Sequence, residues 1–147
     1  MSDPAKSLGP VWSSVHGEKV SPSPFADILS RFDKDYYPTL DIHPGWTNLI
    51  LKLHQLLIFI SPNYTIMQIK TKFGGLRYYA NFVATDSDLT QETSKEIFDC
   101  LIRYYEYLST ITCETCGSWG SLTSLNNLYY TSCEKHSDTP PKDWLKL

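Results

Sequence analysis

Apolar residues recur at helical spacing in three stretches of the chain, and this pattern predicts three helices. The stretches are residues 25–32, 46–60 and 88–111. The middle stretch is apolar around nearly its whole circumference, so we expect it at the centre of the core or shared with a second copy of the chain. The first helix is predicted to bury Ala26, Ile28, Leu29 and Phe32. The third is predicted to bury Leu89, Ile97, Leu101, Tyr104, Leu108 and Ile111, with Asp86, Ser87 or Asp88 as its cap.

Residues 65–83 instead alternate between apolar and polar positions around Gly74-Gly75, which predicts a β-hairpin. If Gly74 and Gly75 form a two-residue loop, Lys72 stands directly opposite Arg77. The face that packs on the helices then consists of Met67, Ile69, Thr71, Phe73, Leu76, Tyr78, Ala80 and Phe82. The opposite face consists of Gln68, Lys70, Lys72, Arg77, Tyr79 and Asn81.

Prolines and serines divide the rest of the chain. Residues 1–24 are predicted to form an irregular arm, and residues 33–46, which contain Pro38 and Pro44, a loop. The core is predicted to span 25–111, a metal-binding module 112–136, and a tail 137–147. The expected fold class is α+β, with helices packed on a hairpin or small antiparallel sheet and a C-terminal zinc module of the treble-clef or ribbon-like type.

The spacing of the cysteines indicates a metal site. Two residues separate Cys113 from Cys116, and after sixteen further residues Cys133 and His136 repeat that spacing. Three thiolates and one imidazole fill the tetrahedral shell of a structural Zn²⁺, whereas a catalytic zinc keeps a position open. The alternative is a set of reduced cysteines beside a surface histidine.

The residues around these ligands carry further expectations. Asn126-Asn127 is a candidate two-residue turn that pairs Leu125 with Leu128, because asparagine tolerates positive φ. The two glutamates inside the metal-binding steps, Glu114 and Glu134, are expected to face solvent. A fourth cysteine, Cys100, is predicted to be a packed thiol on the third helix.

Charge narrows the classes of partner. The 147-residue chain has a net charge of −3, which argues against non-specific binding of duplex DNA. It begins without the pattern of a secretory signal, and its longest apolar run, within 49–60, is too short to span a bilayer. We therefore expect a cytoplasmic protein.

Three cations nevertheless gather on the polar face of the hairpin. Arginine offers a planar fork for phosphate or carboxylate, lysine a point charge and tyrosine a ring or hydroxyl. The predicted ligand-binding residues are Lys70, Lys72, Gly74, Gly75, Arg77 and Tyr79, with an anionic small ligand or an acidic partner surface as the bound group. The alternative is a solvated face, or one neutralised by Asp33, Asp35, Asp41 or Asp86.

The histidines give weaker indications of chemistry. His43 follows Asp41 closely and could form a carboxylate–imidazole pair for acid–base catalysis, although a loop histidine before proline is usually structural. His54, among leucines, is predicted to be a hydrogen-bonded interior or edge residue, and His16 an exposed one. The sequence contains no Ser-His-Asp order, phosphate-binding loop or metalloprotease motif.

The order of four motifs resembles a family of small uncharacterised proteins of bacteriophages and bacteria. The motifs are GWTNLI, QIKTKFGGLRYY, CETCG and the later C-x2-H step, together covering about residues 45–136. The resemblance implies a phage or bacterial origin and names no reaction. It places Lys70, Lys72, Phe73, Gly74, Gly75, Leu76 and Arg77 on the signature of the family.

Three functions follow, in order of preference. The first is a non-catalytic, zinc-stabilised binding protein, an accessory or anti-defence factor in the cytoplasm of a bacterial host that binds a phosphate-containing, nucleotide-like ligand at the basic face. The second is an inhibitor or adaptor that docks an acidic or apolar host protein through that face or helix 46–60, which could also join two copies of the chain. The third is a small nucleotide-directed enzyme that uses His43 and the basic face.

Overall fold

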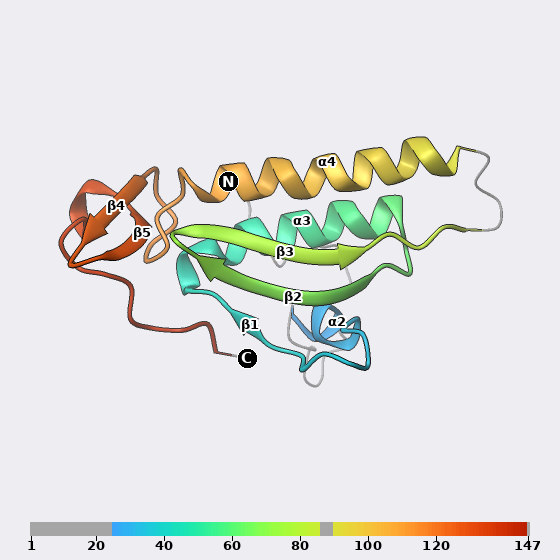
Figure 1. Cartoon of the computed structure of the whole chain (residues 1–147), viewed down its shortest axis with the longest axis horizontal. Coiled ribbons are helices and arrows are strands. Elements are labelled where there is room, and N and C mark those ends of the chain that lie inside the picture. The colour runs from blue at the N-terminus through green and yellow to red at the C-terminus, as the bar shows by residue number, and fades with distance from the viewer. Residues whose placement is uncertain (1–24, 86–89, 147) are drawn as a thin grey trace, which may run out of the picture.

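The computed structural model describes residues 25–85 and 90–146, and within them the chain forms three helices, a mixed sheet and a second, two-stranded sheet (Figure 1). The helices are α2 (Ala26–Ser30), α3 (Thr47–Ile60) and α4 (Gln91–Ser109). The strands are β1 (Leu40–Asp41), β2 (Thr65–Lys72), β3 (Gly75–Asn81), β4 (Ser121–Leu125) and β5 (Leu128–Ser132). Short 3-10 turns, η3 (Pro44–Trp46) and η4 (Glu134–His136), complete the elements. The predicted α+β class is confirmed.

The larger sheet has the order β1-β2-β3, with β1 parallel to β2 and β2 antiparallel to β3. A purely antiparallel sheet was therefore the wrong prediction. The difference comes from β1, which lies inside the predicted loop 33–46 and has only two residues. An element of that length is too short to show an alternating pattern.

The turn of the β2–β3 hairpin is Phe73-Gly74 rather than Gly74-Gly75. Both turn residues have positive φ, 53° and 79°, as a type I′ turn requires. Lys70 consequently pairs with Arg77, and Lys72 pairs with Gly75, so the predicted pairing of Lys72 with Arg77 is wrong. The pairing differs by two residues from the predicted one, and an even shift leaves side chains on their original faces.

Two side chains of the hairpin nevertheless lie elsewhere than predicted. An irregularity between Ile66 and Gln68 buries Ile66 in place of Met67, which is half-buried. Phe73, predicted to pack on the helices, is 68% exposed because it occupies the turn. The predicted inner positions Ile69, Leu76 and Tyr78 are buried, which confirms the centre of that face.

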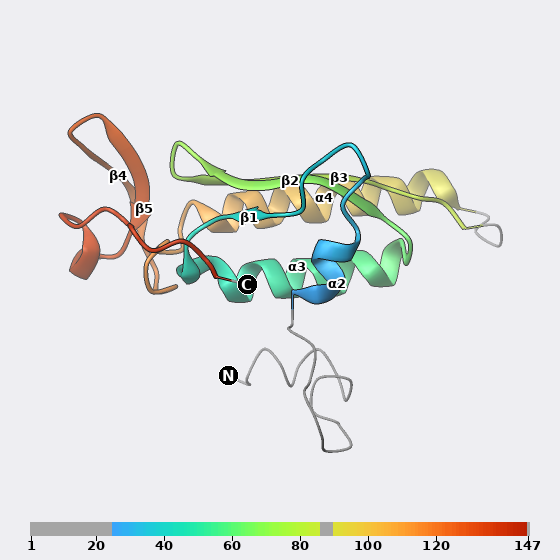
Figure 2. The ribbon, with the colours of Figure 1, turned by 90° about the horizontal axis from the view of Figure 1, so that it is seen from below.

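The core lies between α3 and the inner face of the sheet, with α4 alongside. Figure 2 shows α2 and α3 on the same side of the β2–β3 hairpin. The apolar stripe predicted for residues 46–60 is confirmed as the central element. The buried side chains of the core are Phe25, Ile28, Leu40, Ile42, Trp46, Ile50, Leu51, Leu53, Leu57, Tyr64, Ile66, Ile69, Leu76, Tyr78, Phe98 and Ile102.

Helix α4 buries a different side from the predicted one. Phe98 and Ile102 are in the core, whereas Ile97 and Tyr104 are about half exposed. Cys100 lies on the exposed side as well, so its prediction as a packed thiol is wrong. Leu89 and the predicted caps Asp86, Ser87 and Asp88 lie outside the described residues, as does His16.

The orientation of α4 follows from its position beside β3, which is an edge strand (Figure 1). The backbone N–H of Leu76 donates to Ser109 Oγ at 2.9 Å, and that of Tyr78 donates to Glu106 Oε2 at 3.0 Å. Buried edge N–H groups need such partners. The helix therefore presents Glu106 and Ser109 to the strand, which fixes the rotation of the other side chains.

The segment after the metal module is packed rather than a free tail. The N–H of Leu145 donates to the carbonyl of Ile42 at 2.8 Å, and the ring of Trp144 stacks on His43 with centroids 4.0 Å apart. The chain thus returns to the side of β1 (Figure 2). Within the described residues, none of the helices has the length and apolarity that a membrane span requires.

Candidate metal centre and basic sheet face

Two tight turns bring the four predicted metal ligands together. In the first, the N–H of Gly117 donates to the carbonyl of Cys113 at 2.9 Å, and Gly117 has a φ of 82°, which favours glycine. In the second, the N–H of His136 donates to the carbonyl of Cys133 at 3.1 Å. The β4–β5 hairpin between them turns at Asn126-Asn127 and pairs Leu125 with Leu128, as predicted.

The ligand atoms form a compact cluster that could hold one metal ion. All four lie within 4.8 Å of one another. Sγ of Cys113 is 3.7 Å from Nδ1 of His136, and Sγ of Cys116 is 3.7 Å from Sγ of Cys133. Hydrogen bonds from Ser118 lower the pKa of Cys116 to about 6, which favours the thiolate that metals bind. The predicted grouping of these residues is confirmed.

Glu114, between the first two ligands, does not face solvent as predicted but is 1% exposed. Its Oε1 accepts a hydrogen bond from Thr71 Oγ1 at 2.8 Å, and its Oε2 accepts one from the N–H of Thr131 at 2.9 Å. Burial raises the pKa of Glu114, and these hydrogen bonds oppose that rise. Because Thr71 belongs to β2 and Thr131 to β5, the carboxyl group joins the two sheets.

The 3-10 turn before α3 attaches the metal-binding loop to the core. Trp46 is buried, and its Nε1 donates to the carbonyl of Thr112 at 2.8 Å. The N–H of Gly45 donates to the carbonyl of Glu114 at 2.7 Å, and a Cβ on Gly45 would lie 2.2 Å from the carbonyl oxygen of Cys113. Only glycine can come this close to the backbone of the metal-binding loop. This contact and the indole hydrogen bond explain why glycine and tryptophan occupy positions 45 and 46.

Gly74 and Gly75, predicted to line a ligand site, are buried. The carbonyl of Gly74 accepts a hydrogen bond from Thr131 Oγ1 at 2.7 Å, and a Cβ on Gly74 would lie 2.6 Å from Leu122 Cδ1. The hairpin turn therefore rests against the β4–β5 hairpin. Gly74 serves this protein contact, and the other four predicted ligand-binding residues lie on the outer face.

The outer face of the sheet carries a row of charges across its three strands. Asp41 on β1 pairs with Lys70 on β2, which pairs with Arg77 on β3. Tyr79 and Lys72 lie on the same face and are exposed. In the part of the chain that the structure describes, no acidic group lies within ion-pair distance of Lys70, Lys72 or Arg77.

The alternative in which the protein's own acids neutralise these cations is therefore not seen among the described residues. Asp41 Oδ1 instead accepts a hydrogen bond from Thr39 at 3.3 Å, and Asp33 Oδ1 accepts one from the N–H of Asp35. Asp86 lies outside the described residues. Lys70 and Arg77 are thus like charges directly opposite each other, with Asp41 at one end of the row.

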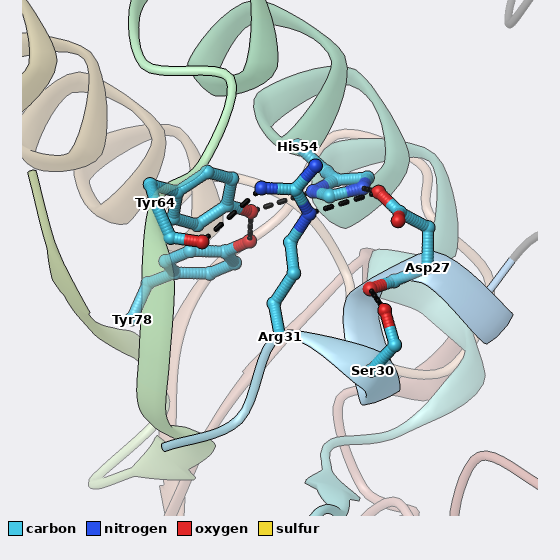
Figure 3. A network of polar contacts seen from close by, with 6 residues as sticks. All are labelled: Asp27, Ser30, Arg31, His54, Tyr64 and Tyr78. Carbon is cyan, nitrogen blue, oxygen red and sulfur yellow. Dashed lines mark hydrogen bonds and ion pairs between the residues drawn. The ribbon is translucent and has the colours of Figure 1, made fainter. Parts of the chain in front are cut away.

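A buried polar network crosses the molecule behind this face (Figure 3). Tyr78 Oη lies 2.7 Å from Tyr64 Oη, which lies 2.5 Å from His54 Nδ1. Nε2 of His54 lies 2.8 Å from Asp27 Oδ2, to which Arg31 also donates at 2.9 Å. The prediction of His54 as a hydrogen-bonded interior residue is confirmed. Burial lowers the pKa of His54 and raises that of Tyr64.

His43 does not form a pair with Asp41, and the structural role expected of a loop histidine before proline is the one observed. It is buried, and its Nδ1 donates to the carbonyl of Asp143 at 2.9 Å. Its ring is covered by Trp144. These contacts give His43 a packing role.

Comparison with models of protein families, with curated proteins and with solved structures finds no match for this chain. The resemblance drawn from the four sequence motifs therefore stays a prediction. Any functional assignment rests on the two features just described, the cysteine–histidine cluster and the basic face.

Proposed function

We propose that this protein is a non-catalytic binding protein stabilised by a structural Zn²⁺. Zinc bonds of about 2.3 Å to sulfur and 2.0 Å to nitrogen give tetrahedral edges of about 3.5 to 3.8 Å. The separations of 3.7 Å between Cys113 and His136, and between Cys116 and Cys133, agree with these edges, and the 3.2 Å between Cys133 and His136 is shorter. Four protein ligands leave no coordination position for a substrate. The Cys113–Cys116 turn, the β4–β5 hairpin and the Cys133–His136 step follow one another in the order of a treble-clef or ribbon-like finger.

The ligand that fits the outer face best is an anion that carries phosphate. The observation behind this proposal is the direct pairing of Lys70 with Arg77 without an acidic partner at ion-pair distance among the described residues. Like charges at directly opposite positions destabilise a sheet, and an anion bound between them would make their contribution to stability favourable. The guanidinium fork of Arg77 suits phosphate, and Lys72 and Tyr79 stand beside it.

In the phage or bacterial setting that the motifs imply, sequestration of such a ligand would make the protein an accessory or anti-defence factor. The biological role depends on the ligand, and a nucleotide-like molecule remains our preferred proposal. Asp41 limits the basic area at β1, because its carboxylate stands next to Lys70 in the row. We therefore place the bound phosphate toward β3.

Thermal unfolding with a panel of inorganic triphosphate and nucleotides tests this proposal. A ligand at one hundred times its Kd should add about 2.7 kcal/mol to the free energy of unfolding. The increase should disappear in Arg77→Gln and fall in Lys70→Gln. Lys52→Gln, an exposed lysine on α3, serves as the matched control and should keep it. Absence of a shift with every anion would exclude the proposal.

A second candidate, docking of a protein partner on α3, is favoured by Phe59, which is 84% exposed. It borders a cavity of about 460 Å³ lined by Lys52, Gln55, Leu56 and Tyr105. This side of α3 could receive an apolar host surface or a second copy of the chain. Sedimentation of the wild type and of Phe59→Ser tests the homo-oligomer directly, since only the wild type should then associate.

A further inference from the structure

Phe73 occupies a position that costs the fold stability in two ways. It is a bulky residue with a φ of 53°, in the left-handed region that disfavours side chains with a Cβ, and its ring is 68% exposed. Asparagine or glycine is the ordinary choice at the first central position of a type I′ turn. Strain that is kept at an exposed position points to function.

Further aromatic and cationic groups surround this ring. Nζ of Lys72 lies 5.8 Å from the centroid of Phe73, and the ring of Tyr129 meets Phe73 edge-on at 6.3 Å. Tyr129 is 49% exposed and Tyr79 is 40% exposed. Figure 2 shows the β4–β5 hairpin, which carries Tyr129, standing at the turn of the β2–β3 hairpin. We call this area the tip surface, made of Lys70, Lys72, Phe73, Arg77, Tyr79 and Tyr129.

We infer that the tip surface binds single-stranded nucleic acid, with a base stacked on Phe73 and phosphates held by the three cations. The inference rests on the proposed anion-binding function and names its ligand class. Exposed rings are sequence-tolerant platforms for unpaired bases, and cations beside them follow the phosphate backbone. Aromatic residues on an open sheet face are a recurrent way to hold unstacked bases.

The dimensions favour a strand over a single nucleotide. Tyr79 pairs with Gln68 at one end of the row, and Lys72 lies at the other end, four residues further along β2 than Gln68. At about 3.3 Å per residue these positions span about 13 Å before Phe73 and Tyr129 are added. Rings stand at both ends of this distance with the cations between them. Duplex DNA fits less well, because its bases are stacked and the chain has a net charge of −3.

Fluorescence anisotropy on the full, zinc-loaded chain tests the inference. One probe is an oligothymidylate of about 12 nucleotides, and the other has the same number of phosphates but no bases. We expect the oligothymidylate to bind about tenfold more tightly, because one stacked base contributes a factor of about 5 to 150. Arg77→Gln should weaken both probes alike and lower the salt slope by about 0.7.

Variants at Phe73 separate stacking from folding. Phe73→Asn should raise the melting temperature, since it suits the turn, and should remove the preference for bases. Phe73→Leu keeps an apolar side chain without a ring and should lose the preference too, whereas Phe73→Tyr should keep it. A Phe73→Asn protein that still prefers the oligothymidylate would overturn the inference.

The outcomes also distinguish failure of the nucleic-acid inference from failure of the proposed anion-binding function. Equal affinity for both probes would overturn base stacking and leave anion binding in place. No affinity for either probe, nor for inorganic triphosphate, would overturn both. Equally tight binding of a polyglutamate peptide of matched charge would assign the tip surface to an acidic protein instead.

Discussion

The hydrogen bonds of His54 run in one direction. The carboxylate of Asp27 can only accept, so Nε2 of His54 donates to it and Nδ1 is left to accept from Tyr64. Tyr64 in turn accepts from Tyr78. A proton added at Nδ1 would face the oxygen of Tyr64 and reverse the order of both hydroxyl groups. The folded protein therefore holds His54 in its neutral form.

This arrangement predicts a loss of stability in mild acid. Because the folded-state pKa of His54 is lowered, the unfolded chain binds the proton first as pH falls below about 6.5. The free energy of unfolding then decreases, by at most about 1.4 kcal/mol per pH unit for one proton. Asp27, whose pKa is also lowered, acts in the same direction near pH 4.

Urea denaturation at pH 7.5 and pH 5.5 measures the effect, with zinc present throughout. His54→Gln should be less stable at pH 7.5 and should lose less stability on acidification than the wild type. The metal ligands titrate equally in both proteins, so the difference between them isolates His54. Parallel losses in the two proteins would contradict the prediction.

Single residues were predictable from sequence where local spacing determines their role. The intervals between Cys113, Cys116, Cys133 and His136 predict the cluster that could hold a metal, without reference to any other part of the chain. Glu114 gives no such local signal. Its burial depends on Thr71 and Thr131, which only the folded chain brings to it.

At the scale of elements, the sequence predicted the helices and the main hairpin. It did not always predict which side of an element packs on the core. Helix α4 carries large side chains on two neighbouring sides, and periodicity cannot choose between them. The unpaired edge of β3 makes the choice through Glu106 and Ser109. The centre of each hairpin face was predicted correctly despite the wrong turn, because the shift was even, whereas Met67 and Phe73 at its ends were not.

The contact between α4 and β3 gives a prediction about Glu106. Glu106→Ala removes the acceptor for the N–H of Tyr78 and should lower the free energy of unfolding by about 1–3 kcal/mol. Glu106→Gln keeps an acceptor oxygen and should recover most of the loss. Glu96→Ala, an exposed change on the same helix, should stay within about 0.5 kcal/mol of the wild type.

Amide hydrogen exchange checks the cause as well as the size of this effect. In Glu106→Ala the N–H of Tyr78 should exchange faster than in the wild type, with Leu76 still protected by Ser109. Equal stability of Glu106→Ala and Glu96→Ala would show that water satisfies the strand edge instead.

At the scale of the whole molecule, the predicted boundary between core and metal module at residues 111–112 does not separate two independent parts of the structure. Gly45 and Trp46 from the core bond to the loop that carries the first ligands, and Thr131 from the module bonds to Gly74. These contacts join residues 57 or more positions apart. No local pattern could predict them, and they make the module part of one folded unit.

Removal of the proposed zinc should consequently disturb the core and not the module alone. The free energy of zinc binding in such sites is folding free energy, about 10 kcal/mol or more. Without it the loop that begins at Cys113 loses its attachment to the ion, and we expect the neighbouring carbonyl of Thr112 to become a less fixed acceptor for the indole N–H of Trp46. We expect a chelator to lower the melting temperature and to increase hydrogen exchange at the Trp46 indole.

Cys113→Ser should reproduce both effects, whereas Cys100→Ser, which changes the exposed thiol of α4, should retain one zinc per chain and the wild-type protection. A chelated protein with a protected Trp46 indole would mean that Glu114 and the two glycine contacts hold the module without the ion.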